Sequence, residues 1–177
     1  MLKEFKKYAT SFFNNTNFAP YYTSFTHPYY GANGVKNEIK GCYGAGAYCA
    51  LSPFDMQIDD TRVILKENIR QKCIYNYAVK QSNTIIYYDY MIKFYDTCIN
   101  SKFPSFSDEC AGRSMKDIID SAIVEACIKS SFLDYSNQNT SNNTILQADA
   151  QAKFDLKIRM TPSILVNKYR IRVSIYY

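Results

Sequence analysis

The residues best able to do chemistry in this 177-residue chain are its six cysteines, Cys42, Cys49, Cys73, Cys98, Cys110 and Cys127. No two of them form a C-x-x-C pair and the chain has a single histidine, so no metal site is predicted. An even number of cysteines favours three disulfides formed in an oxidising compartment. The alternative is six buried thiols, because free cysteine packs as a small hydrophobic side chain.

Six cysteines can pair in many ways, and spacing favours one set. Cys42–Cys49 is a local pair, and Cys98–Cys110 closes the next shortest connection. Cys73–Cys127 is then the remaining pair. Each bridge is expected to stabilise the fold by about 2–4 kcal/mol.

No other residues are arranged for catalysis. His27 has no nucleophile or carboxylate partner visible in the sequence. The acidic pairs at 59–60 and 108–109 stand at predicted helix starts, where carboxylates favour the helix dipole. The chain has no Gly-rich phosphate loop and no nucleophile elbow, so we predict no catalytic residues and no cofactor.

Three glycosylation sequons begin at Asn14, Asn139 and Asn142. With the cysteines they predict a luminal protein of the secretory pathway, although residues 2–13 lack the features of a signal peptide. We therefore expect a signal upstream of Met1 and a chain truncated at both ends.

The net charge of +5 is spread along the sequence, which does not favour a nucleic-acid partner. The sequence has no run of about 18 apolar residues, so no membrane span is predicted.

Hydrophobic periodicity predicts the elements that position these residues. We expect helices at 2–13, about 60–80, about 85–98, about 114–127 and about 145–153, a strand at 18–26, a loop at 41–53 and a hairpin of 163–166 with 169–171. The predicted inner faces are Leu65, Ile69, Cys73 and Tyr77; Ile85, Tyr88, Ile92, Tyr95 and Cys98; and Ile118, Ile119, Ala122, Ile123, Ala126 and Cys127. A Ser-x-x-Asp pattern at Ser114 predicts the start of the helix at about 114–127. This order indicates one α/β domain, 1–177, with a disulfide-stapled helical insertion at about 55–150.

Thr161-Pro162 precedes an aliphatic strand, where a proline must stand at the start or edge. The segment resembles the cis-proline segment of thioredoxin-fold proteins, and an ordinary trans proline is the alternative. In that fold a C-x-x-C pair faces the cis-proline. Here His27 and Tyr30 stand at the corresponding positions, so thiol–disulfide exchange is not expected.

An ordered set of short runs narrows the resemblance: GAYCA at 46–50, ENIRQKC at 67–73, YDY at 88–90, DAQ at 149–151, TPSILVN at 161–167 and YR at 169–170. The chain resembles the luminal central domain of vacuolar sorting receptors. That resemblance implies a thioredoxin-like fold in a receptor of Golgi and endosomal membranes, with soluble cargo and neighbouring receptor domains as partners. A structural luminal or extracellular component of a larger assembly, and a disulfide-isomerase-like enzyme that has lost its redox pair, are the alternatives.

The sequence predicts a peptide site beside Pro162. In thioredoxin-like folds a cis X-Pro bond leaves the backbone groups of the preceding residue, here Thr161, unpaired, and an extended peptide could pair with them. We expect His27, Tyr29 and Tyr30 to lie across this groove. Since histidine changes charge between about pH 5 and pH 8, binding would respond to an acidifying compartment. The alternative is that the terminal segment or a neighbouring domain covers this face.

Overall fold

A computed structural model describes residues 2–15, 18–27, 40–52, 58–158, 164–166 and 169–171. Six α-helices lie within these ranges: α1 (Leu2–Asn15), α2 (Arg62–Lys80), α3 (Ile85–Phe94), α4 (Asp108–Met115), α5 (Ser121–Ser131) and α6 (Thr144–Asp155). Shorter turns are η1 (Gly44–Gly46), the π-helical η2 (Tyr95–Ile99) and η3 (Tyr135–Asn137). The strands pair as two antiparallel hairpins, β1 (Cys42–Tyr43) with β2 (Tyr48–Cys49) and β3 (Ile164–Val166) with β4 (Tyr169–Ile171).

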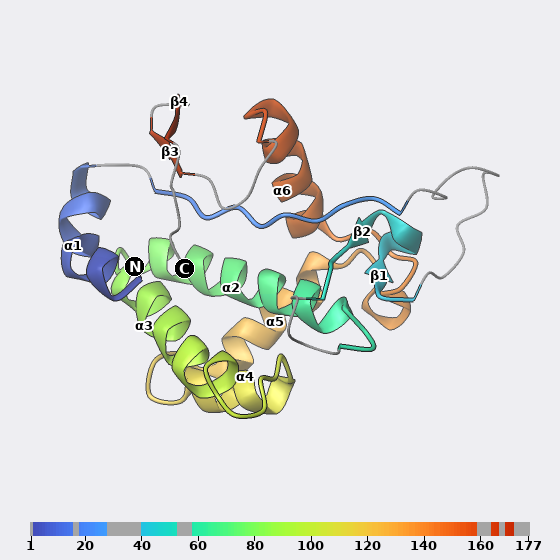
Figure 1. Ribbon diagram of the computed structural model, residues 1–177, viewed down its shortest axis with the longest axis horizontal. Coiled ribbons are helices and arrows are strands. Elements are labelled where there is room, and N and C mark those ends of the chain that lie inside the picture. Colours follow the sequence, from blue (N-terminus) through green and yellow to red (C-terminus); the bar gives the residue numbers. More distant parts are fainter. Residues whose placement is uncertain are drawn as a thin grey trace.

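Helix α2 is the centre of the described structure. It packs on α3 and α5 and also contacts the β1–β2 hairpin and α6 (Figure 1). Leu65, Ile69 and Cys73 are fully or almost fully buried along α2, as the four-residue spacing predicted. Tyr77, the fourth residue of that predicted stripe, is only partly buried.

The structure contains the three disulfides that the spacing favoured. Cys42–Cys49 closes the β1–β2 hairpin, Cys73–Cys127 joins α2 to α5, and Cys98–Cys110 joins η2 to α4. No cysteine of the chain is left free. The helices are thus cross-linked around the core that α2 builds.

The predicted inner face of the helix at about 114–127 is wrong. Helix α5 begins at Ser121, because the Asp120 side chain caps it by accepting a hydrogen bond from the Ala122 N–H. Ser114 is instead buried near the end of α4. This shift moves the buried face of α5 to Val124, Ile128 and Ser131, while Ala122, Ile123 and Ala126 are exposed and Ile118, Ile119 and Cys127 are only partly buried.

The predicted inner face of the 85–98 helix also needs correction. Tyr88 and Cys98 are buried, but Tyr95 is exposed, and Ile85 and Ile92 are only partly buried. Tyr87, Tyr90 and Phe94 face the core instead, and the Tyr90 hydroxyl bonds to buried Glu67 of α2. The π-helical turn after Phe94 changes the helical periodicity at this end.

Residues 18–27 run as an extended segment rather than the predicted strand. Their described pairing is one bridge, in which Phe25 and Cys49 exchange backbone hydrogen bonds of 3.1 and 2.8 Å. Further along, the Tyr22 N–H donates to Asp149, and the Lys72 ammonium donates to the Pro20 carbonyl and to Asp149. Side chains of α2 and α6 therefore hold the segment where a sheet was expected.

The described residues are mostly helical, and their strands, of two or three residues each, form two small hairpins. Residues 41–53, predicted as a loop, contain the β1–β2 hairpin, while the predicted C-terminal hairpin is confirmed as β3–β4. Helices α2–α6 fill the region predicted as a helical insertion. That they form an insertion remains a prediction.

Candidate functional site

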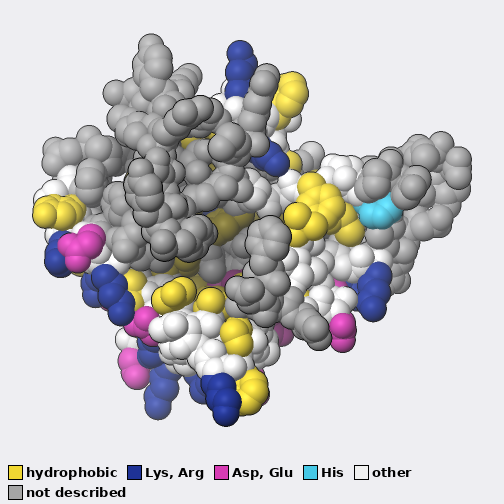
Figure 2. All heavy atoms as spheres, viewed as in Figure 1, with side chains coloured by type: hydrophobic (Ala, Val, Ile, Leu, Met, Phe, Trp, Pro, Cys, Tyr) yellow, Lys and Arg dark blue, Asp and Glu magenta, His cyan; other side chains and the backbone are white. Residues whose placement is uncertain are grey.

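Most of the predicted peptide site lies outside the described residues. Thr161, Pro162, Tyr29 and Tyr30 all fall there. His27 is described: it is partly buried, and its backbone N–H donates a 2.8 Å hydrogen bond to the Gly46 carbonyl. Figure 2 shows one face of the molecule, on which hydrophobic side chains stand among charged ones. The proposed groove itself remains a prediction.

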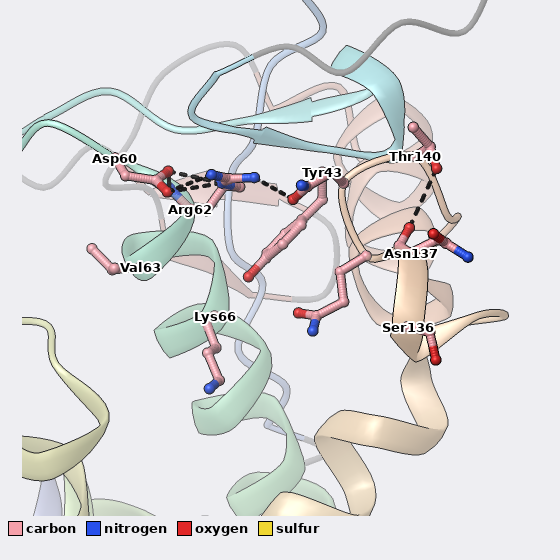
Figure 3. Close-up of a pocket in the computed structure, with 10 residues that line it drawn as sticks. Tyr43, Asp60, Arg62, Val63, Lys66, Ser136, Asn137 and Thr140 are labelled. Carbon is pink, nitrogen blue, oxygen red and sulfur yellow. Dashed lines mark hydrogen bonds and ion pairs between the residues drawn. The ribbon is translucent and has the colours of Figure 1, made fainter.

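A different site is visible at the N-terminal end of α2. A pocket of about 420 Å³ opens between α2, the β1–β2 hairpin and the loop that contains η3 (Figure 3). Its lining consists of Tyr43, Asp60, Arg62, Val63, Lys66, Ser136, Asn137, Gln138, Asn139 and Thr140. Apart from Val63 these side chains are polar, aromatic or charged, which is the composition of a recognition site.

The turn into α2 fixes one wall of the pocket. Asp60 accepts hydrogen bonds from the Arg62 backbone N–H and from its guanidinium, and these bonds lower the pKa of Asp60. Thr61 donates to the Gly41 carbonyl at 2.9 Å. A Cβ on Gly41 would lie 2.7 Å from Thr61 Oγ1, and the φ of +79° also favours glycine. The β1 approach to α2 thus depends on this glycine.

The loop wall is held by Asn139. Its carbonyl accepts a 2.7 Å hydrogen bond from the Ala45 N–H, and its side-chain oxygen accepts one from the Arg62 guanidinium. Within the loop, the Asn137 carbonyl accepts bonds from the backbone N–H groups of Thr140 and Ser141. Asn139 therefore joins the hairpin, α2 and the loop into one pre-formed rim.

Tyr43 lies at the base of the pocket. Its side chain is 5% exposed, and its ring packs edge-on against Phe132 with centroids 5.1 Å apart. Figure 3 shows the hydroxyl directed into the space between α2 and the loop. This hydroxyl has no hydrogen-bond partner among the residues that the structure describes, and burial raises the pKa of Tyr43 to about 12. It is therefore a neutral donor facing the cavity.

Lys66 stands one turn after Arg62 on α2 and supplies a second cation. Its ammonium donates a 2.6 Å hydrogen bond to Asp108 of α4. Burial alone would raise the pKa of Asp108, but the hydrogen bonds and charges of Lys66 and Arg70 outweigh it and lower that pKa. The two cations of the lining are thus both paired with a carboxylate, Arg62 with Asp60 and Lys66 with Asp108.

A buried charge network lies behind this wall. Glu67 accepts hydrogen bonds from Arg70, Gln71 and Tyr90, and Arg70 also pairs with Asp108. The side chains of Glu67 and Arg70 are each 1% exposed. The network joins α2 to α3 and α4, and we assign it a structural role because its members bond to one another across these helices.

The predicted glycosylation sites are placed only in part. The Asn142 side chain accepts from the Tyr48 hydroxyl and donates to Gln147. Asn139 bonds to Arg62, and nothing is described of the Asn14 side chain. Modification at these three positions remains a prediction.

No pattern in the sequence predicts this pocket. The helix start at Asp60 and the polar run at 134–144 were both visible, but their meeting depends on a contact between Arg62 and Asn139, 77 residues apart. Tyr43 gave no local signal in a chain with 17 tyrosines.

Across the described ranges, no three His, Cys, Asp or Glu side chains are grouped to hold a metal ion, and no helix is long and apolar enough to cross a membrane.

Comparison with known proteins identifies the family. The model of the vacuolar sorting receptor thioredoxin-like domain matches residues 1–176. Among curated proteins, the chain is 28% identical over 162 residues to vacuolar-sorting receptor 3 of Arabidopsis thaliana (89% of this chain, 25% of the receptor). It is 26% identical over 162 residues to vacuolar-sorting receptor 1 of Pisum sativum (89% and 25%). The chain thus spans about a quarter of the length of these relatives, and it belongs to the vacuolar sorting receptor thioredoxin-like domain family.

Proposed function

We propose that this chain is a non-catalytic domain of a sorting receptor, located in the lumen of the Golgi, endosome or vacuole, and that it recognises peptide signals on soluble cargo proteins. Membership of the vacuolar sorting receptor domain family supports the receptor role. Three disulfides support an oxidising, luminal environment.

The observation that carries the non-catalytic part is the state of the cysteines. All six are in disulfides that join core elements, and all except Cys127 are buried. Disulfide exchange needs an accessible thiolate of low pKa, usually beside a resolving cysteine. A domain whose cysteines are all committed in this way can bind a peptide but has no thiol with which to attack it.

Two places can receive cargo under this proposal. One is the groove beside Thr161 and Pro162, with His27, Tyr29 and Tyr30 opposite, where an extended peptide would pair with the backbone. The other is the pocket at Tyr43. The groove would bind the extended backbone of the peptide. The pocket would select one side chain or one end of the peptide.

The test is calorimetric titration of the disulfide-intact domain with peptides from the sorting signals of soluble vacuolar proteins, at about pH 7 and about pH 5.5. We expect saturable binding that weakens at the lower pH. Thr161→Pro removes the backbone donor of the groove, so a folded variant that binds like wild type would exclude the groove. A chain that binds no peptide, but purifies with one stoichiometric protein, would instead be a structural component.

A further inference from the structure

We propose that the pocket between α2 and the 136–140 loop binds a carboxylate of a cargo peptide, with the Tyr43 hydroxyl and the Lys66 ammonium as its donors. This inference rests on the proposed function and assigns a ligand chemistry to one site.

The first support is the Tyr43 hydroxyl, which is open to the cavity and free to bond to a ligand there. A hydroxyl of this kind can donate one hydrogen bond and accept others. Tyr43 lies at the base of the cavity with 5% of its surface exposed, and its hydroxyl has no bonding partner in the described part of the chain. Because burial raises its pKa to about 12, the group stays protonated and can donate to a ligand oxygen.

The second support is Lys66, which has hydrogen-bonding capacity to spare. A lysine ammonium carries three protons. Asp108 is its one hydrogen-bond acceptor among the described residues. Since Lys66 also lines the pocket, the remaining protons are available to a ligand there. Two donors from different elements, β1 and α2, favour an acceptor with several lone pairs.

The third support is the sign of the charge. Arg62 is engaged by Asp60 and Asn139, so this trio forms the wall. Lys66 is paired with Asp108, which does not line the pocket. Asp60 is the one acidic residue of the lining, and Arg62 holds its oxygens, so the lining presents cationic donors and no unpaired carboxylate to a ligand. The volume of about 420 Å³ lies within the range of ligand sites, about 300–1,000 Å³, and holds the end or a side chain of a peptide.

A peptide can bring a carboxylate at its C-terminus or on Asp and Glu, and the experiment separates these sources. Three libraries of short peptides are titrated by fluorescence anisotropy against the disulfide-intact chain. One has free C-termini and no Asp or Glu, the second is its C-terminally amidated copy, and the third is amidated and contains one Asp or Glu. We expect one carboxylate-bearing library, or both, to bind at least about tenfold tighter than the second library.

Variants then assign the carboxylate to this pocket. Tyr43→Phe keeps the ring on Phe132 and removes the hydroxyl, so we expect about tenfold weaker binding of the preferred library. Lys66→Met should weaken binding of the preferred library by more than Tyr43→Phe does. Tyr135→Phe is the matched control, since Tyr135 also packs edge-on against Phe132 but does not line the pocket.

The outcomes distinguish this inference from the proposed function. Equal binding of all three libraries, or unchanged binding in folded Tyr43→Phe, would overturn the carboxylate pocket while leaving peptide recognition intact. Absence of binding by any peptide, including the vacuolar sorting signals, would overturn both.

Discussion

Arg62 donates a hydrogen bond to the side-chain oxygen of Asn139, 77 residues later in the chain, and this bond joins α2 to the loop over the pocket. The same guanidinium is held by Asp60 on its other side. Arg62 therefore helps to fix the pocket rim by bonding to both Asp60 and Asn139.

Arg62→Lys should loosen this rim. Lysine keeps the charge but lacks the planar fork that reaches two partners. We expect faster amide hydrogen exchange at Ala45, Thr140 and Ser141, with about 1 kcal/mol lost in the free energy of unfolding. Arg113→Lys, which alters an exposed pair with Glu109, is the control and should change neither quantity. Unchanged exchange in the Arg62 variant would mean that the loop is held by other contacts.

The long disulfide should contribute more stability than the short one. Cys73–Cys127 closes 54 residues and Cys42–Cys49 closes 7, so the chain-entropy model gives about 4 and about 2 kcal/mol. Paired Cys→Ser variants, followed by denaturant unfolding, measure the difference. An equal loss from both pairs would show that native-state packing, rather than loop closure, decides their contributions.

Arg70→Met should destabilise the fold strongly. It leaves Glu67 buried without its counter-charge, at a cost of about 3–5 kcal/mol. The double variant Arg70→Met, Glu67→Met should recover much of this loss, because no buried charge is then unpaired. Chemical unfolding of the two variants is the measurement. A double variant less stable than the single one would show that the network stabilises the fold beyond compensating its own charges.

Asp60 and Asp108 should change the free energy of unfolding with pH in the opposite direction to Glu67. The pKa values of Asp60 and Asp108 are lowered, so their stabilisation is complete above the unfolded-state pKa, about 4, and is lost as the pH falls through the folded values. Burial raises the pKa of Glu67, so its contribution is present at low pH and declines as the pH rises through its folded value. Asp108→Asn should flatten the loss of stability in acid, and Glu67→Gln should steepen it. Unfolding free energies across the acid range in both variants decide this, and parallel curves would contradict the assignment.

The disulfides could be predicted because an even cysteine count and the lengths of the intervening segments favour one pairing. The start of α5 could not be predicted, since Ser114 and Asp120 are both residue types that cap helices, and only packing places Ser114 inside α4. The buried face of α3 was predicted wrongly for a similar reason. The Tyr90 hydroxyl bonds to Glu67, 23 residues away in the chain, and no local pattern contains that contact.

The candidate site was harder to predict than the helices. Its lining comes from three segments that meet only in the folded chain, and no motif marks Tyr43 or Gln138. The family resemblance, by contrast, depended on an ordered set of short runs, several of which have structural roles. Within ENIRQKC, for example, Glu67 and Arg70 form the buried ion pair. Lys72 donates a hydrogen bond to the Pro20 carbonyl, and Cys73 forms a disulfide with Cys127.

The central claim is that the domain binds cargo peptide without thiol chemistry, and one titration tests it most directly. A fluorescent peptide that carries a vacuolar sorting signal and an internal disulfide is titrated with the chain by anisotropy, and both molecules are then weighed by mass spectrometry. We predict saturable binding, a peptide recovered with its disulfide unchanged, and a domain that retains three disulfides. An anisotropy that does not saturate, or a recovered peptide whose disulfide has been reduced or exchanged with the domain, would contradict the account.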